Sequence, residues 1–279
     1  MTDSPRNTGR LDHLSAPARR WRPSTAVRLT LLIHLAALIA LLFRPLWWPW
    51  VVAVLLANHL ALGLIGMWPR SSLLGENMKR LPDAAARRGE IAVTFDDGPH
   101  PEVTPVVLDI LDRYGVKASF FCVGEKAAAH PGIVREIVRR GHAIENHSMH
   151  HSGFFGFYGP VALRRDIGTA QSVLGGIAGR PPRFFRAPMG IRNPMLDPVV
   201  ARMGLRYISW TRRGFDTVAR DPEVVLKRLL DGLAAGDILL LHDRRSIHGN
   251  PIVLTVLPAL LEKLSASGLK PVSLTMAMR

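Results

Sequence analysis

Residues 91–99 read Ile-Ala-Val-Thr-Phe-Asp-Asp-Gly-Pro, an apolar run that ends in two adjacent carboxylates. The run is typical of a buried strand, and the Gly-Pro pair ends it. Asp96 and Asp97 therefore lie at the carboxyl end of a strand. Two neighbouring carboxylates repel each other, and a divalent cation relieves that repulsion. The stretch predicts a metal site in which one aspartate binds the ion and the other acts as a base.

A cluster of histidines about fifty residues further along can supply the remaining ligands. Residues 146–151 read Asn-His-Ser-Met-His-His. His147 and His151 are four residues apart, so we expect them to share a face of a helical turn. With Asp97 they make a three-ligand site that leaves a position for water. One divalent ion is therefore predicted: zinc is the first choice, and cobalt, nickel or iron would accept the same ligands.

Together these motifs resemble those of the polysaccharide deacetylases that share the NodB homology domain, carbohydrate esterase family 4. Residues 94–99 match the family's first motif completely, and residues 147–151 match its second motif. The third motif, Arg-x-Pro-x-Gly, is present at 186–190, and the fifth, Leu-x-Leu-His, at 239–242. The fourth motif is degraded, because Asp216 is followed by threonine where the family often has tryptophan. The resemblance covers about residues 90–275.

The resemblance implies catalytic roles for four residues. Asp96 would be the general base that deprotonates the attacking water. His242 would be the general acid that protonates the leaving amine. Arg186 would orient Asp96, and Asp216 would orient His242 and favour its charged form.

It also implies a small substrate site. The backbone N–H of Met189 would stabilise the oxyanion. Leu239 and Leu241 would line an apolar pocket for the acetyl methyl group, although ordinary core packing explains these leucines almost as well.

Two pairs of arginines follow predicted strands, and they are Arg212, Arg213, Arg244 and Arg245. They are explained either as a solvated basic rim or as guanidinium groups that bind a phosphate or carboxylate of the substrate. The second explanation suggests a lipid-linked sugar phosphate.

The region from residue 90 to residue 279 alternates short apolar runs with helical patterns, which predicts an α/β domain with parallel strands. Strands are expected at 91–95, 118–122, 143–145, 184–186, 207–210, 238–241 and 271–274. Helices are expected at 104–114, 133–140, 160–174, 198–203, 222–233 and 251–267. The candidate chemical residues follow strands, as in barrel enzymes. The resemblance implies a distorted (β/α)7-type barrel.

The N-terminal quarter contains two long apolar runs, 27–43 and 46–68, separated by Arg44 and Pro45. Five of the six tryptophans lie at the edges of these runs, as in membrane-interface belts. We therefore predict a two-helix membrane anchor over 23–68, which the tryptophans and the run lengths favour over a pair of buried globular helices. A disordered basic segment, 1–22, would precede it, and a linker, 69–89, would follow.

The net charge of +14 bears on topology and partners. Basic residues flank both ends of the anchor and only Arg44 lies in its turn, so the positive-inside rule places the catalytic domain in the cytoplasm. Many members of the family work outside the membrane, which keeps the external side open. The basic residues are dispersed arginines for the most part, which argues against nucleic-acid binding. The single cysteine excludes an intramolecular disulfide.

Two polar or aromatic clusters have structural explanations. Residues 154–158 carry three phenylalanines and a tyrosine. They could cover the pocket or touch the bilayer, but we expect them to be packed in the core. His34, Asn58 and His59 lie within the apolar runs, where we expect hydrogen bonds between the two helices.

The sequence thus predicts a membrane-bound, metal-dependent amidohydrolase that removes an acyl group, expected to be acetyl, from an N-acylated carbohydrate. A deformylase or an O-deacetylase would use the same residues. Two non-catalytic alternatives are a glycan-binding protein that retains the barrel and a membrane-assembly protein. The sequence leaves protein partners unknown.

Overall fold

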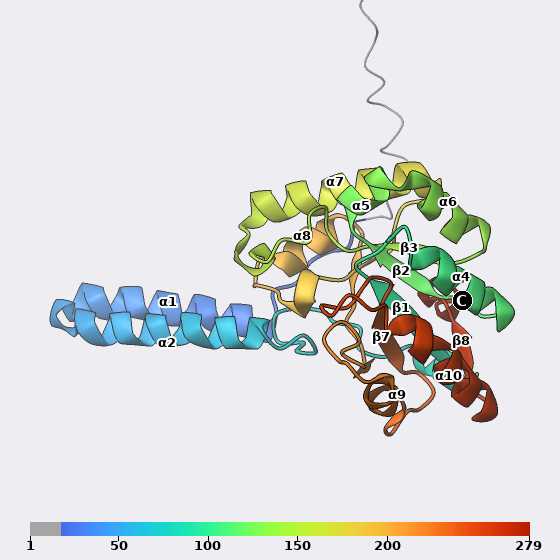
Figure 1. The fold of residues 1–279 in the computed structure, drawn as a ribbon. Coiled ribbons are helices and arrows are strands. Elements are labelled where there is room, and N and C mark those ends of the chain that lie inside the picture. Colours follow the sequence, from blue (N-terminus) through green and yellow to red (C-terminus); the bar gives the residue numbers. More distant parts are fainter. Residues whose placement is uncertain (1–17) are drawn as a thin grey trace, which may run out of the picture.

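The computed structural model describes residues 18–279 of the chain (Figure 1). The segment 1–17, the larger part of the predicted disordered N-terminus, lies outside the described residues. Residues 18–22 do not behave as predicted, because they pack on the barrel. Arg19 N donates to the Ala201 carbonyl at 2.9 Å, and Trp21 Nε1 donates to Asp197 Oδ2 at 2.9 Å.

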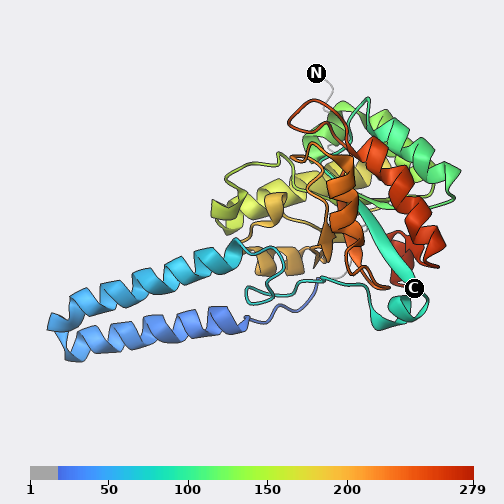
Figure 2. The ribbon, with the colours of Figure 1, turned by 60° about the horizontal axis from the view of Figure 1, so that its bottom comes forward.

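Two antiparallel helices, α1 (Thr25–Phe43) and α2 (Trp48–Gly66), project from the domain as a helical hairpin joined by the short helix η1 (Pro45–Trp47) (Figures 1 and 2). Both helices are long and apolar enough to cross a membrane. Nineteen residues at about 1.5 Å each span roughly the 30 Å of a bilayer's hydrocarbon core. Their leucines are exposed to a degree that is unusual for a core helix.

Polar residues inside the hairpin form part of the contact between its helices. Thr30 Oγ1 donates to Asn58 Oδ1 at 3.2 Å, which confirms the expected bond between helices for Asn58. The two histidines differ from the expectation. The His34 and His59 rings meet edge to face, with centroids 5.3 Å apart, while each Nδ1 hydrogen-bonds a carbonyl of its own helix.

Parallel strands form a distorted barrel, as predicted. The strands are β1 (Glu90–Asp96), β2 (Ser119–Cys122), β3 (Ala143–Asn146), β4 (Phe184–Phe185), β5 (Arg206–Tyr207), β6 (Arg212–Arg213), β7 (Ile238–His242) and β8 (Lys270–Val272). Their order is β5-β4-β3-β2-β1-β7-β6, and β8 pairs with the start of β1. The two-residue strand β6 was not predicted, because so short a segment carries no detectable periodicity.

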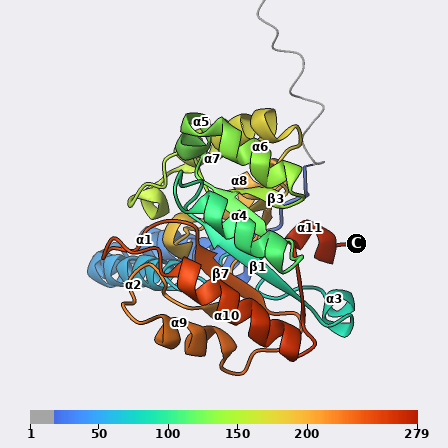
Figure 3. The ribbon, with the colours of Figure 1, turned by 45° about the vertical axis from the view of Figure 1, so that its right-hand side comes forward.

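Most helices cover the outside of the sheet, and two short ones, which contain Ala85 and Leu274, pack with Ala92 and Ile238 of its inner face. The helices are α3 (Asp83–Arg87), α4 (Thr104–Arg113), α5 (Gly124–Ala129), α6 (Pro131–Arg139), α7 (Pro160–Ala178), α8 (Leu196–Arg202), α9 (Pro222–Leu230), α10 (Val253–Ala266) and α11 (Leu274–Ala277). Figure 3 shows α4, α10 and α9 along the outer side of β1 and β7. The short helices α3, α5 and α11 were not predicted.

Residues 69–89 are part of the folded domain and not a linker. Leu74, Leu81 and Ala85 are buried, and Met78 forms a bridge with Ile208 beyond β5. The composition of this segment suggested a linker because its buried residues are too widely spaced to form a periodic run.

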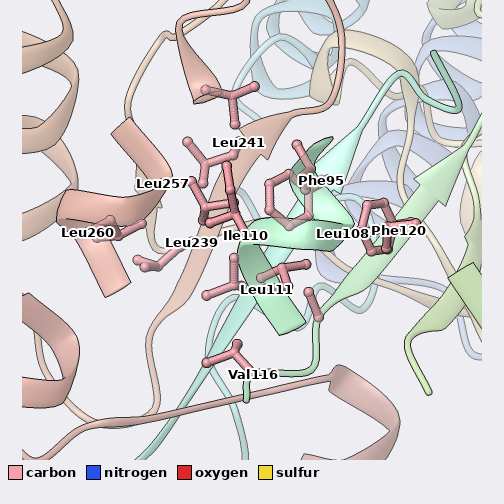
Figure 4. Packing of buried hydrophobic residues seen from close by; sticks show 14 of the residues in the cluster. Phe95, Leu108, Ile110, Leu111, Val116, Phe120, Leu239, Leu241, Leu257 and Leu260 are labelled. Atoms are coloured by element: carbon pink, nitrogen blue, oxygen red, sulfur yellow. The ribbon is translucent and has the colours of Figure 1, made fainter. Parts of the chain in front are cut away.

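The largest apolar cluster lies between the sheet and the outer helices (Figure 4). Alternation along β1 sends Val93 and Phe95 into this cluster and sends Thr94 and Asp96 to the opposite face, inside the barrel. The same alternation along β7 sends Leu239 and Leu241 into the cluster. The packing of two central strands therefore fixes which side chains reach the barrel interior.

Candidate active site

A small pocket lies at the carboxyl ends of the barrel strands. Its volume is about 100 Å³. We call it the active-site pocket, and it is lined by Asp96, Asp97, His147, His151, Met189, Gly190, Trp210, Arg213, Thr217, Leu240, His242 and Arg244. The predicted metal ligands and the predicted acid and base thus share one cavity.

Asp97, His147 and His151 bring one potential ligand atom each to within 4.8 Å of one another. Asp97 Oδ1 lies 3.0 Å from His151 Nε2 and 3.4 Å from His147 Nε2. His147 Nδ1 lies 2.8 Å from the carbonyl oxygen of Arg186 and must donate to it, which leaves the lone pair of Nε2 free. Two imidazole nitrogens and a carboxylate converge here, with His151 partly exposed, and this set of donors fits a divalent cation.

The backbone reaches this arrangement by a loop and not by the helical turn that the spacing suggested. Ser148 and His151 have φ angles of 69° and 47°, which are left-handed. Asn146 Oδ1 accepts from Ser148 N at 2.9 Å, and Ser148 Oγ accepts from His151 N at 3.0 Å. These local bonds stabilise a conformation that four-residue periodicity cannot describe.

Asp97, the first residue after β1, is itself left-handed, with φ at 73°. The turn aims its carboxylate toward the histidines. Burial favours the neutral acid, but the two histidines outweigh it and hold the pKa of Asp97 well below its usual value. The second oxygen, Oδ2, lies 3.0 Å from Nε of Arg244.

Asp96 is held by a fully buried arginine, as the family resemblance implied. Arg186 Nη1 donates to Asp96 Oδ1 at 2.5 Å and to Thr94 Oγ1 at 3.0 Å, and Nη2 donates to the Ser209 carbonyl at 3.0 Å. The guanidinium lies 4.1 Å from the centroid of the Phe121 ring. The other Asp96 oxygen, Oδ2, faces the pocket, 3.8 Å from His147 Nε2.

Asp216 holds His242 from two directions despite the degraded motif around it. Asp216 Oδ2 accepts from His242 N at 2.8 Å, and Oδ1 accepts from the ring Nδ1 at 2.8 Å. Burial lowers the pKa of His242, but the attraction of Asp216, with smaller contributions from Asp97 and Asp96, raises it above the ordinary value. The ring is therefore stabilised in its charged form, with Nε2 available to the pocket.

The prediction for Leu239 and Leu241 is wrong. Both side chains are fully buried in the outer cluster with Leu257 and Leu260 (Figure 4), and Leu240 lines the pocket instead. The reason is the period of two along β7, which places residue 240 on the same face as His242 and residues 239 and 241 on the opposite face.

Only two of the four predicted arginines reach the pocket. Arg213 and Arg244 line it, and Arg213 also lies over the rings of Trp210 and Phe215. Arg212 lies on the other face of β6, where its guanidinium donates to the Asp231 and Gly232 carbonyls and contacts Asp237.

Arg245 also lies outside the pocket. It pairs with Glu102 and donates to the Gly249 carbonyl at 3.1 Å. The prediction of an anion-binding role is therefore wrong for Arg212 and Arg245. Arg212 alternates with Arg213 along β6, and Arg245, in the loop after β7, pairs with Glu102.

Besides Leu240, sequence reasoning missed three residues that shape the site. Trp210 and Thr217 line the pocket. Asp243 is buried behind the aspartate turn, where its Oδ2 accepts from Thr104 Oγ1 at 2.5 Å and burial raises its pKa to about 7. Trp210 could have been found because it ends a predicted strand. Asp243 could have been found because it directly follows His242.

The aromatic cluster after the second motif divides between core and surface. Phe155 is buried as expected, whereas Phe154 and Phe157 are 73% and 86% exposed. The expectation of core packing is therefore wrong for Phe154 and Phe157. A short helix, η2 (Phe155–Phe157), turns alternate rings in opposite directions.

Comparisons with known proteins find relatives among carbohydrate deacetylases. The family model for "Polysaccharide deacetylase" matches residues 83–208. Chitooligosaccharide deacetylase from Azorhizobium caulinodans is 40% identical over 157 residues, which make up 56% of this chain and 74% of that protein.

Solved structures share the fold. The Bc1960 peptidoglycan N-acetylglucosamine deacetylase has a TM-score of 0.67 at 27% identity, over 72% of this chain and 92% of that chain. A family 4 acetyl xylan esterase from Clostridium thermocellum, in complex with a cobalt ion, has a TM-score of 0.62 at 32% identity, over 67% of this chain and 89% of that chain. On its motifs, its fold and these relatives, this chain belongs to the polysaccharide deacetylase family, carbohydrate esterase family 4, and is a hydrolase.

Proposed function

We propose that this protein is a membrane-anchored, metal-dependent enzyme that hydrolyses the N-acetyl group of an N-acetylated carbohydrate. One observation carries the proposal: a single pocket contains three convergent metal-ligand atoms, a carboxylate held by a buried arginine, and an imidazole held by a carboxylate. A protein that only bound glycans would have no need for an oriented acid and base.

Asp97, His147 and His151 are the proposed ligands of one divalent cation. When bound, such an ion polarises the acyl carbonyl and lowers the pKa of water. Zinc suits two imidazoles and one carboxylate, and cobalt, nickel or iron would be held by the same atoms.

Asp96 is the proposed general base. Its Oδ1 is held by Arg186, so Oδ2 is free to take a proton from the attacking water. The water oxygen then bonds to the acyl carbon. Met189 lines the pocket with φ at 56°, and we assign the developing oxyanion to its backbone N–H.

His242 is the proposed general acid. As the C–N bond breaks, its Nε2 proton passes to the leaving nitrogen, and an amine and a carboxylate result. Asp216 supports this step because it keeps the ring charged and oriented.

The substrate is proposed to be N-acetylated and to carry a negative charge. Leu240 and Trp210 give the pocket an apolar wall that suits a methyl group, which favours acetyl over formyl. Arg213 and Arg244 place two guanidinium groups at the same pocket, where a phosphate or carboxylate of the substrate would complement them.

The helical hairpin is the proposed membrane anchor. Its length and exposed leucines suit a bilayer, and both of its ends join the domain. Basic residues flank those ends while the turn holds one arginine, Arg44, so we place the catalytic domain in the cytoplasm. A reporter fused to the C-terminus tests this side directly.

The experiment is acetate release from a chitooligosaccharide by the full chain in detergent. We expect release that stops after chelation, returns with added zinc or cobalt, and is lost in His242→Ala. An O-acetylated xylan assayed in parallel distinguishes an O-deacetylase. Binding of the oligosaccharide without release of acetate in any metal would show a non-catalytic glycan-binding protein.

A further inference from the structure

A second cavity, which we call the groove, lies between the helical hairpin and the barrel. Its volume is about 600 Å³, within the range of small-molecule sites. One wall is formed by one face of each hairpin helix, with Val27 and Leu31 on α1 and Leu62 on α2. The opposite wall is formed by Phe157 and residues 191–195 of the barrel.

The polar groups in the groove are largely bonded to the protein itself. The ring Nδ1 of His34 and that of His59 each hydrogen-bond a carbonyl four residues earlier, at 2.8 Å. The Asn193 side-chain amide donates to the carbonyls of Gly156 and Tyr158 at 3.0 and 2.9 Å. The surface left for an occupant is mainly apolar, so the groove suits a hydrocarbon.

The groove is continuous with the surface that we assign to the bilayer. Leu31 and Phe157 line it and are 62% and 86% exposed, and Met195 at its edge is 49% exposed. A hydrocarbon chain in the bilayer can therefore enter the groove sideways, without crossing water.

One loop separates the groove from the active-site pocket. Met189 and Gly190 line the pocket, and the next residues, beginning with Ile191, line the groove. The loop is fastened to the hairpin, because Arg192 N donates to the Gly66 carbonyl at 3.1 Å. An amphipathic molecule can thus have its head in the pocket and its tail in the groove.

We infer that the groove holds the hydrocarbon chain of the substrate while its N-acetylated sugar lies in the active-site pocket. The inference rests on the proposed deacetylase function and names the substrate class: an N-acetylated sugar or short saccharide carried on a long hydrocarbon chain. The hydrocarbon chain moves from the apolar bilayer into an apolar groove, so the move adds little binding affinity. The benefit is orientation, because a held chain keeps the head group close to the acid and base.

The glycine at position 63 allows a specific test. It lines the groove, and a Cβ added there meets nothing within 4 Å, so a larger side chain can begin at this position without a clash and Gly63→Leu should reduce the space in the groove. Ala61→Leu is the matched control, because residue 61 is exposed on the same helix and does not line the groove.

The substrates are the methyl and hexadecyl glycosides of one N-acetylated chitooligosaccharide, assayed with the full chain in the same micelles. We expect wild type and Ala61→Leu to prefer the hexadecyl glycoside. Gly63→Leu should lose about tenfold in kcat/KM on that glycoside and remain unchanged on the methyl glycoside. An equal loss on both glycosides, or no preference in wild type, would overturn the inference.

A binding measurement separates this inference from the proposed function. A hexadecyl glycoside with a photoreactive group at the end of its chain should label Leu31, Phe157 or Ile191, and Gly63→Leu should abolish that labelling. Labelling confined to the outer helix faces would indicate ordinary bilayer lipid contacts and reject the groove. If the groove is labelled but neither glycoside releases acetate, the deacetylase proposal fails, and the groove is still shown to bind a hydrocarbon chain.

Discussion

The carboxylate of Asp216 binds His242 twice, once at the backbone N–H and once at the ring Nδ1, each at 2.8 Å. The pair fixes the ring rotamer and raises the pKa of the ring at the same time. The threonine that replaces the expected tryptophan in this motif leaves both contacts in place. The degraded fourth motif therefore retains the interaction that a general acid requires.

Asp216→Asn should move the alkaline limit of activity to lower pH. In the proposed mechanism the acid form of His242 protonates the amine, and the pKa of His242 is raised. Wild-type activity should therefore persist above the usual histidine pKa and fall as pH rises through the raised value. Without the charge of Asp216, burial lowers that pKa. The measurement is the pH profile of kcat/KM, with exposed Asp231→Asn as control. An unmoved alkaline limit would contradict the assignment of His242.

Asp97→Ala and His147→Ala should each abolish metal binding, because each removes one of the three proposed ligands. His242→Ala should keep one equivalent of metal and lose about 100-fold or more in kcat. Elemental analysis of the purified variants checks the metal content beside the activity. Metal loss in His242→Ala, or full occupancy without Asp97, would place the ion elsewhere.

Arg186→Met should affect both stability and rate. The guanidinium is fully buried and pairs with Asp96, so its removal leaves a buried carboxylate without its partner, at a cost of about 3–5 kcal/mol in the free energy of unfolding. Thermal unfolding in detergent measures the first effect. Arg186→Lys keeps the charge but not the three contacts, so a folded Lys variant with low kcat and unchanged KM would show that Arg186 positions the base.

Gly98→Ala should disrupt the aspartate turn. A Cβ at this position would clash with the carboxylate of Asp243, and that carboxylate is already bonded to Thr104. Activity and the unfolding temperature should both fall. Gly132→Ala is the control, since a Cβ there meets nothing within 4 Å. Wild-type activity in Gly98→Ala would mean that Asp243 moves freely and does not support the turn.

Leu240→Ala and Leu241→Ala should have different effects, although the residues are neighbours. Leu240 lines the pocket, so its truncation should raise the rate on propionyl relative to acetyl substrates. Leu241 lies in the outer core, so its truncation should cost about 2–5 kcal/mol of stability and leave that ratio unchanged. Competition between the two acyl groups, together with unfolding measurements, checks both outcomes. The reverse pattern would mean that β7 presents its other face.

Much of the fold and the site could be predicted from the sequence, because the relevant signals are local. The run before Asp96 and the run before His242 predicted central strands. The motifs predicted the cluster of Asp97, His147 and His151, but not the backbone that forms it. The left-handed backbone of His151 depends on a hydrogen bond from its N–H to Ser148 Oγ, and the spacing of the histidines does not reveal such a bond.

The remaining errors concern the direction in which side chains point and contacts between residues that are far apart in the sequence. Motif matching assigned Leu239 to the substrate pocket, although the alternation toward His242 points it into the core. Arg212 and Arg213 were indistinguishable in a two-residue strand. The packing of 69–89 on the barrel depends on contacts with residues more than a hundred positions away, such as Ile208, and no periodic pattern records these.

The bond from Arg192 to Gly66 has a practical consequence for anyone who works with a shortened protein. Cutting away the first sixty-six residues to obtain a water-soluble barrel would delete the acceptor of that bond and one side of the groove. Such a fragment would show the chemistry of the pocket but not its natural selectivity. The ratio of the rate on a soluble sugar to the rate on a sugar with a hydrocarbon chain would therefore be higher for the fragment than for the intact protein.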